Sequence, residues 1–218
     1  MSNSALVNYT KISPHKNSPR KSKIDKITIH HMAGNLSVET CGNVFQSREA
    51  SSNYGIGSDG RVGLYVEERD RSWASSNGDN DHRAVTIEVA NDGGASTNWH
   101  VSDTALEKCI ELCVDICRRN GIEKLNFTGD KNGNLTMHSY FAATACPGPY
   151  LKSKFPYIAE EVNTRLGAAA APAEDKTESS VLYRVQVGAF SKKANAEKLC
   201  AELKAKGYTD AFIKAGEA

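Results

Sequence analysis

The sequence predicts an α/β protein, because strand-like and helix-like segments alternate along it. Residues 26–31 and 84–90 are short, apolar and rich in β-branched side chains, as buried strands are. Residues 102–120 repeat apolar side chains at helical spacing, start at a capping Ser or Asp and stop before a glycine. The composition, 39% hydrophobic and 24% charged, is that of a globular protein, and no apolar run approaches the ~20 residues of a membrane span.

The remaining segments continue this alternation. Residues 37–48 predict a helix that begins at a serine cap. Residues 53–56 and 61–66 predict two strands joined by a GSDG turn. Residues 125–128 predict a short strand, and residues 150–166 predict a closing helix.

Changes in composition divide the chain into four parts. Residues 1–25 are rich in Ser, Lys and Pro and form a basic N-terminal arm, and residues 26–166 hold the alternating segments. Residues 167–181 are rich in Ala, Pro and acidic residues without apolar periodicity, which is typical of a linker. Residues 182–218 have a β-α-β pattern, with a helix at 192–206, and this unit is too small to bury a core alone.

The N-terminal arm is basic, with six Lys and Arg residues against one Asp over residues 1–26. A solvated, flexible tail is one interpretation, and attraction to an anionic polymer is the other. Nucleic acid is not favoured as a partner, because no helix-turn-helix, zinc-finger or aromatic stacking motif accompanies the charge. The arm lacks the apolar core of a signal peptide, so we expect a protein made in the cytoplasm without one.

The chain has six cysteines, and their spacing is not that of a disulfide framework, so reduced thiols are expected. Cys109, Cys113 and Cys117 recur every four residues and share one face of the predicted helix. A metal site can use such a face. Apolar residues lie on it too, and cysteine is among the most buried residue types, so we favour core packing.

Two histidines, His30 and His31, follow the first predicted strand directly in the segment KITIHHMAG. Histidines at a strand end can be core residues, acid/base groups or metal ligands. Further along, TMHSYFAATACPGPY presents His138 and Cys146, eight residues apart, in a Pro- and Gly-rich loop. Two histidines and a thiolate suit zinc, and a catalytic zinc site has three protein ligands with the fourth position open.

Glu88 lies in the middle of the strand AVTIEVA. Alternation places Val85, Ile87 and Val89 on one face and Glu88 on the other. A carboxylate here is unusual, and it indicates either an edge strand with a solvated face or a general base beside a water molecule.

Four segments, ITIHHMAG, SSNYGIGSDGRV, HRAVTIEVAND and HSYFAATACPGPYL, resemble in this order the type 2 N-acetylmuramoyl-L-alanine amidases. This zinc family includes phage lysins, bacterial cell-wall amidases and animal peptidoglycan-recognition proteins. The resemblance covers about residues 24–166. It implies an α/β fold with a central mixed β-sheet flanked by helices, and one Zn²⁺ per chain in a groove on one side.

The resemblance also implies roles for individual residues. His30, His138 and Cys146 match the zinc ligands, and Glu88 matches the catalytic glutamate of the bacterial members. His31 then points to the other side of the strand and is structural.

The sequence departs from the family pattern at two positions. Ser52 stands where some members have a tyrosine, and Thr144 stands where some have a lysine. Glu88 is therefore the favoured base, with Thr144 at most a hydrogen-bond donor to the transition state.

Four more residues lie in family-like segments. Tyr54 is expected to pack under the site. Asn53, Trp73 and His82 are expected to line the groove, although His82 is equally plausible as a surface residue.

The implied reaction is zinc-assisted hydrolysis of the amide between N-acetylmuramic acid and L-alanine in peptidoglycan. The layout favours a phage or prophage endolysin that reaches the wall by holin-type release and lyses the cell. The alternatives are a bacterial autolysin with the same chemistry, a non-catalytic peptidoglycan-binding module, and a cysteine peptidase using Cys146 and His138.

The C-terminal segment LYRVQVGAFSKKANAEKLCAELKAKGYTDAFI resembles the first half of a SPOR domain, a module that binds peptidoglycan glycan strands. A full SPOR domain has two β-α-β halves, so either the chain is truncated or a second copy supplies the other half. Such a module raises the effective concentration of the wall substrate. Neither nucleic acid nor membrane insertion is expected.

Overall fold

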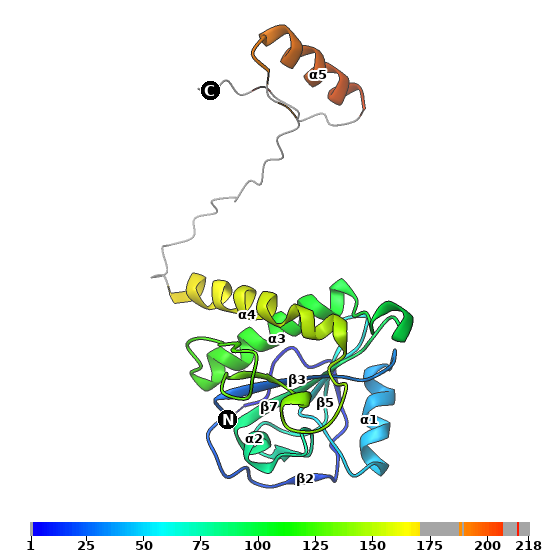
Figure 1. Cartoon of the computed structure of the whole chain (residues 1–218), viewed down its shortest axis with the longest axis vertical. Coiled ribbons are helices and arrows are strands. Elements are labelled where there is room, and N and C mark those ends of the chain that lie inside the picture. The colour runs from blue at the N-terminus through cyan, green and yellow to red at the C-terminus, as the bar shows by residue number, and fades with distance from the viewer. Residues whose placement is uncertain (1, 171–187, 189, 207–212, 214–218) are drawn as a thin grey trace. The chain divides into compact units, whose positions relative to one another are not determined.

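The computed structural model describes residues 2–170, 188, 190–206 and 213 (Figure 1). The chain divides into two units, residues 1–172 and residues 173–218, which are described separately. No helix in the described part of the chain has the length and apolar character that crossing a membrane requires.

The first unit is built on a six-stranded sheet in the order β1-β5-β4-β7-β3-β8. The bounds are β1 Tyr9–Thr10, β3 Lys26–His31, β4 Tyr54–Ile56, β5 Val62–Leu64, β7 Ala84–Val89 and β8 Leu135–Met137. The β4–β5 pair is antiparallel and the other four pairs are parallel, so the expected mixed sheet is confirmed. Two further strands, β2 (Lys16–Asn17) and β6 (Arg71–Ser72), form a small antiparallel sheet.

Four α-helices and two 3₁₀ helices complete the described part of this unit. They are α1 Val38–Ser47, α2 Gly78–Arg83, α3 Asp103–Asn120, α4 Pro149–Ala170, η1 Ala95–Thr97 and η2 His138–Tyr140. The predicted caps are present: Ser37 Oγ accepts from the Thr40 amide, and Ser102 Oγ accepts from the Ala105 amide. Gly121, at φ 68°, ends α3 in the left-handed conformation that glycine adopts without strain.

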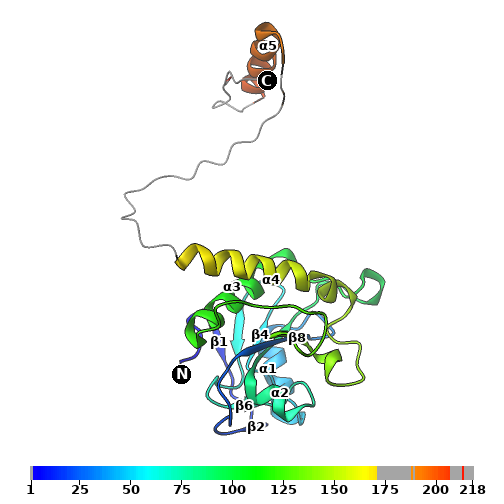
Figure 2. The same ribbon diagram turned by 60° about the vertical axis from the view of Figure 1, so that its left-hand side comes forward.

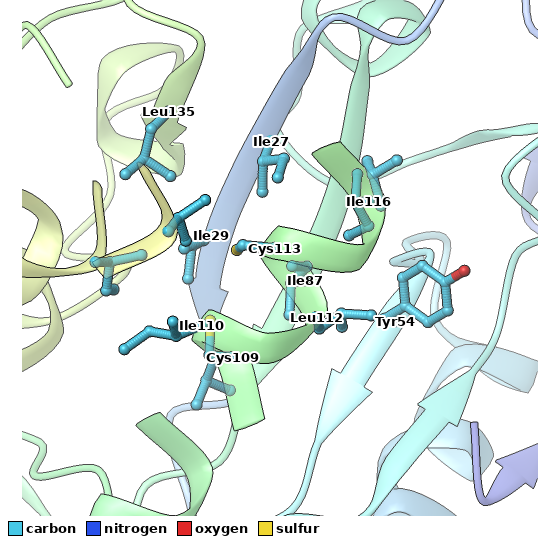
Figure 3. Close-up of a cluster of buried hydrophobic side chains, with 14 of the residues drawn as sticks. Ile27, Ile29, Tyr54, Ile87, Cys109, Ile110, Leu112, Cys113, Ile116 and Leu135 are labelled. Atoms are coloured by element: carbon cyan, nitrogen blue, oxygen red, sulfur yellow. The ribbon is translucent and has the colours of Figure 1, made fainter. Parts of the chain in front are cut away.

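Helices α3 and α4 lie side by side over one face of the sheet (Figures 1 and 2). The apolar residues of the strands meet α3 there, and Figure 3 shows Ile27, Ile29, Tyr54, Ile87, Cys109, Ile110, Leu112, Cys113, Ile116 and Leu135. Cys109, Cys113 and Cys117 are buried in this core, as expected. Each fully buried aliphatic side chain contributes about 1.5–3 kcal/mol, so this face supplies much of the stability.

A smaller apolar cluster lies on the opposite face, where α1 packs through Cys41 and Phe45 against Tyr65. It covers only part of that face. Elsewhere the same face carries buried threonines of β3, β7 and β8, namely Thr28, Thr86 and Thr136. One face of the sheet is therefore an apolar core, and the other combines a small core with polar side chains.

The N-terminal segment, expected to be a flexible arm, is part of the folded unit. Its strand β1 extends the sheet beside β5, and the Ser4 amide donates to Tyr54 Oη at 2.9 Å. The buried Arg20 guanidinium donates to the carbonyls of Glu68, Asp70 and His82 at 2.6–2.9 Å. Burial lowers the pKa of Arg20 to about 10. A flexible tail is therefore the wrong interpretation of this basic segment.

Two element predictions also differ from the structure. Residues 125–128 form no strand, and the edge strand is β8 at 135–137, whose first amide and the preceding one both donate to Asn126 O. Helix α4 continues to Ala170, so the first residues of the expected linker are helical, as alanine-rich sequence favours. The rest of that linker, residues 171–181, lies outside the described residues.

In the second unit, helix α5 (Lys193–Ala205) matches the helix expected at 192–206. Its flanking strand-like segments, including 182–187 and 209–212, lie outside the described residues. The β-α-β arrangement of this unit therefore stays a prediction.

Candidate active site

The strands β7, β3 and β8 are parallel neighbours, and their carboxyl ends bring the predicted functional residues to one edge. In the register, Thr86, Thr28 and Thr136 lie beside one another, and one pleat further on Glu88 lies beside His30. His138 follows β8 directly, at the start of η2. Clefts beyond the carboxyl ends of parallel strands are the usual place for sites in open α/β sheets.

Three potential metal ligands come together at this edge. One side-chain atom each from His30, His138 and Cys146 lies within 4.8 Å of the others. Cys146 Sγ is 3.6 Å from His30 Nδ1. Nitrogen and sulfur ligands at about 2.1 and 2.3 Å from a tetrahedral zinc ion are themselves about 3.6 Å apart, so this pair fits such an ion.

The protonation of the histidines also suits a metal. Burial and the neighbouring His138 and His31 lower the pKa of His30 to about 3, and burial lowers the pKa of His138. Both imidazoles are therefore neutral at pH 7 and offer a lone pair, which metal ligation requires.

The pKa of the Cys146 thiol is raised, whereas the pKa values of the two histidines are lowered. Burial, and next the carboxylate of Glu88, raise its pKa, while the backbone of His31 acts in the opposite direction. A cation held beside it favours the thiolate.

Several buried polar atoms at the site find no hydrogen-bond partner within the described part of the chain. They are His30 Nε2, His138 Nε2 and Glu88 Oε2. Burying such groups unpaired costs about 1–3 kcal/mol each. A bound cation would give His138 Nε2 a partner, whereas His30 meets Cys146 through Nδ1, so its unpaired Nε2 is not the atom that this geometry presents to the cation. The chemistry of two nitrogens and one sulfur is that of zinc.

Glu88 lies in a central strand, between β4 and β3, so the edge-strand interpretation is wrong. Its side chain is 17% exposed, and Oε1 is 3.9 Å from His30 Nδ1. Burial raises the pKa of Glu88 to about 8. A nearby cation favours the ionised carboxylate, which is the form that can accept a proton.

The remaining predicted site residues have other contacts. Asn53 is fully buried, donates to Val66 O at 3.1 Å and accepts from the Thr86 amide. It therefore fixes the start of β4 against β7, and its buried position is not that of a groove-lining residue. Tyr54 is buried in the core on the α3 face, and its Oη donates to Glu68 Oε1 at 2.7 Å; no described contact joins it to the ligand cluster.

Trp73 and His82 contact the N-terminal segment. Trp73 Nε1 donates to Asn17 Oδ1 at 2.8 Å, and its ring lies 5.7 Å from that of His15. His82 Nδ1 accepts from the Lys21 amide at 3.1 Å. No described contact joins either residue to the ligand cluster.

Two polar residues near the site differ in exposure. Ser52, which replaces the tyrosine of some members, is buried and donates to the Tyr54 carbonyl. Thr144 is exposed on the loop, and its Oγ1 accepts from the Cys146 amide at 3.2 Å. Thr144 therefore shapes the turn that presents Cys146.

Sequence reasoning missed two residues that adjoin the site. The Trp99 ring meets the His31 ring edge-on at 5.4 Å, and Asn91 Nδ2 donates to the Trp99 carbonyl at 2.8 Å. Trp99 lies in the segment 93–99, whose spacing carries no motif, and Asn91 lies near the end of the family-like segment HRAVTIEVAND, where it drew no role.

Comparison with known proteins places this site in a family. A model of the N-acetylmuramoyl-L-alanine amidase family matches residues 20–149, and a SPOR domain model matches residues 159–217. The first match covers more than half of the chain and includes all three potential ligands and Glu88. No curated protein matches the sequence.

Similar solved structures share the fold at low sequence identity. The endolysin N-acetylmuramoyl-L-alanine amidase LysCS from Clostridium intestinale URNW superposes with a TM-score of 0.51 and 20% identity, covering 74% of this chain and 93% of its own. The hydrolase AmiA from Staphylococcus aureus gives a TM-score of 0.56 at 16% identity, covering 76% and 85%. PlyL gives 0.55 at 14%, covering 72% and 96%.

The family match, the α/β sheet and the clustered His30, His138 and Cys146 agree with one another. The chain is a peptidoglycan amidase with a SPOR domain match in its C-terminal part, and it belongs to the N-acetylmuramoyl-L-alanine amidase family.

Proposed function

We propose that this amidase is a zinc enzyme with one ion per chain, held by His30, His138 and Cys146. The observation that supports this most directly is the approach of the three ligand atoms to within 4.8 Å of one another. Zinc, when bound there, supplies Lewis-acid polarisation of the scissile carbonyl. The substrate bond is the amide between the lactyl group of N-acetylmuramic acid and L-alanine.

In this proposal Glu88 is the general base. Its carboxylate accepts a proton from the attacking water and returns it to the departing amine. A carbon–oxygen bond forms as the carbon–nitrogen bond breaks, which leaves a lactyl carboxylate and a free L-alanine amine. Glu88 is suited to this role because it lies beside His30 in the sheet, with its Oε1 3.9 Å from His30 Nδ1. Thr144, exposed beside Cys146, donates a hydrogen bond to the reacting carbonyl.

The cysteine-peptidase alternative is disfavoured by the state of Cys146. Its pKa is raised by burial, whereas a catalytic thiol needs a lowered pKa. The thiol also lies beside two neutral histidines, a donor set that zinc prefers. A chelator inactivates the zinc enzyme, and a thiol reagent applied to metal-free protein inactivates the peptidase.

We further propose that residues 26–166 are the amidase domain proper, that 167–181 link it to the SPOR unit at 182–218, and that this unit binds peptidoglycan. The unit raises the local concentration of the wall substrate. Pairing of two copies through it stays a prediction. An endolysin of a phage or prophage, released by a holin and acting in cytolysis, fits this layout, and a bacterial autolysin is the alternative.

The test is mass spectrometry of purified peptidoglycan after digestion with wild-type protein, Glu88→Gln and Glu49→Gln. Glu49 is an exposed carboxylate and serves as the control. Wild type and Glu49→Gln are expected to release peptides with a free L-alanine amine and to leave the glycan strands intact. Glu88→Gln is expected to be slower by about 10²–10⁴-fold. Equal release by Glu88→Gln would remove Glu88 from the mechanism, and wall binding without release by any variant would indicate a binding module.

A further inference from the structure

The three ligands of the site are anchored in different ways. His30 lies within β3, between two paired strands, and His138 directly follows β8. Cys146 lies outside the sheet, on a loop whose internal bonds are local ones: Gly148 N to Ala145 O at 2.8 Å, and Ser139 N to Cys146 O at 3.2 Å. The Cys146 thiol has a hydrogen-bond contact with the backbone of His31, at the end of β3, and further contacts support the loop there.

The segment 98–100 adds a second connection between the loop and the strand. The amide of Tyr150 donates to the Asn98 carbonyl at 3.1 Å, which joins the segment to the start of α4. The Trp99 ring meets the His31 ring edge-on at 5.4 Å. The His100 ring lies 4.4 Å from that of Tyr150. The segment thus contacts both the strand that holds one ligand and the turn that holds another.

Gly148 shows how close this contact is. A Cβ atom at this position would lie 3.2 Å from the His31 ring and 3.2 Å from Trp99 Cβ. Its φ of +83° is also one that glycine adopts readily and other residues do not. The turn after Cys146 therefore packs directly against His31 and Trp99, and a side chain at this position would require them to move.

The segment is itself held in place. Asn91 Nδ2 donates to the Trp99 carbonyl at 2.8 Å, directly after β7. The Asp92 amide donates to the His100 carbonyl at 3.0 Å, and the Asp92 carboxylate lies 2.6 Å from His100 Nδ1.

The backbone of the segment is strained. Asn98 and Trp99 have φ values of 55° and 60°, a left-handed conformation that a tryptophan rarely adopts. Strain of this kind persists where the surrounding contacts over-determine a conformation, and it concentrates at functional sites.

We infer that the segment 98–100 is a clamp that holds Cys146 beside His30, and that Trp99 is the positioning residue that sets the metal affinity of the site. This inference rests on the proposed metal site. Among the described residues, the contacts of Trp99 are not with the ligands themselves. It acts through His31 on the strand and through Gly148 on the turn.

The test is a zinc titration of the metal-free, full-length protein in competition with a chromophoric chelator. The variants are Trp99→Ala, Trp99→Phe and, as a control, Tyr157→Ala on the exposed surface of α4. Substitution of outer residues at metal sites lowers metal affinity by about 10–100-fold, and we expect a loss in this range for Trp99→Ala. Phenylalanine keeps a ring edge against His31 and should restore most of the affinity, and Tyr157→Ala should bind zinc as wild type does.

The outcomes separate the inference from the function on which it rests. Failure of wild type to bind zinc would contradict the proposed metal site. Wild-type affinity in Trp99→Ala would contradict the clamp alone. Thermal unfolding of the metal-free proteins shows whether Trp99→Ala is still folded. If it is not, Trp99→Phe and Trp99→Leu carry the test, and equal zinc affinity in these two variants would contradict a role for the ring.

Fluorescence gives a second readout, because the chain has two tryptophans, Trp73 and Trp99. In Trp73→Phe the remaining emission comes from Trp99, and we expect it to change as zinc binds. In Trp99→Phe the emission comes from Trp73, whose described contacts are with His15 and Asn17, and we expect little change. A zinc response confined to Trp73 would contradict the clamp.

Discussion

One face of the central sheet presents Ile27, Ile29 and Ile87 to helix α3, whereas the other presents Thr28, His30 and Glu88. The two sets alternate along the same strands, so each strand serves both faces. Burial of apolar side chains on the first face stabilises the fold, whereas buried groups without hydrogen-bond partners on the polar face destabilise it. We therefore expect substitutions on the apolar face to change mainly stability. Substitutions of His30 or Glu88 on the polar face, at the next residue of the same strand, should change mainly the chemistry of the site.

The largest expected effect is loss of activity in His30→Ala. The substitution removes one of three proposed ligands, so we expect no stoichiometric zinc binding and no amidase activity above background. Metal content after dialysis and release of L-alanine amines from purified peptidoglycan measure this. Full zinc content in His30→Ala would contradict the assignment of this ligand.

The neighbouring substitution, Ile29→Ala, should have the opposite profile. Ile29 is fully buried against α3, so its truncation should lower the free energy of unfolding by about 2–5 kcal/mol. Zinc binding and the activity per folded molecule should stay near wild type, because the side chain points away from the ligands. Denaturant unfolding and metal analysis on one preparation check both. A large loss of zinc affinity would show that the two faces are coupled.

Removal of the metal should lower the unfolding temperature of wild type but not that of His30→Ala. Zinc that binds only the folded state stabilises it, by about 2.7 kcal/mol at a free concentration a hundred times the dissociation constant. Wild type should therefore unfold at a lower temperature after chelation, and His30→Ala should unfold at the same temperature with and without chelator. Equal unfolding of wild type in both conditions would contradict a site in the folded protein.

The sequence predicted the strands that carry the site and the three side chains that come together there, because alternation and the spacing of His138 and Cys146 are local signals. Their role as zinc ligands stays a proposal. The folded N-terminal segment was not predictable in this way. Arg20 is fixed by backbone carbonyls 48 to 62 residues away. Every residue has such a carbonyl, so the sequence does not show which residues accept these bonds. The same holds for Trp99, whose contact with His31 depends on a strained loop rather than on spacing.

The smallest expected effect concerns the threonine row behind the site. Thr28 Oγ1 lies 2.9 Å from Thr136 Oγ1 and accepts from Asn80 Nδ2 at 3.0 Å, all within the buried interior. Thr28→Val keeps the shape and removes one hydrogen bond from each of these groups, which retain Ser75 Oγ and the Ile27 carbonyl as partners. It should therefore cost about 0.5–1.5 kcal/mol of unfolding free energy. Thr28→Val combined with Thr136→Val should cost less than the sum of the two single losses, because both single substitutions remove the same Thr28–Thr136 hydrogen bond. Because the row lies one pleat from His30, zinc affinity should change less than stability in both variants. A larger change in zinc affinity than in stability would instead assign the threonines to the metal site rather than to the structural interior of the sheet.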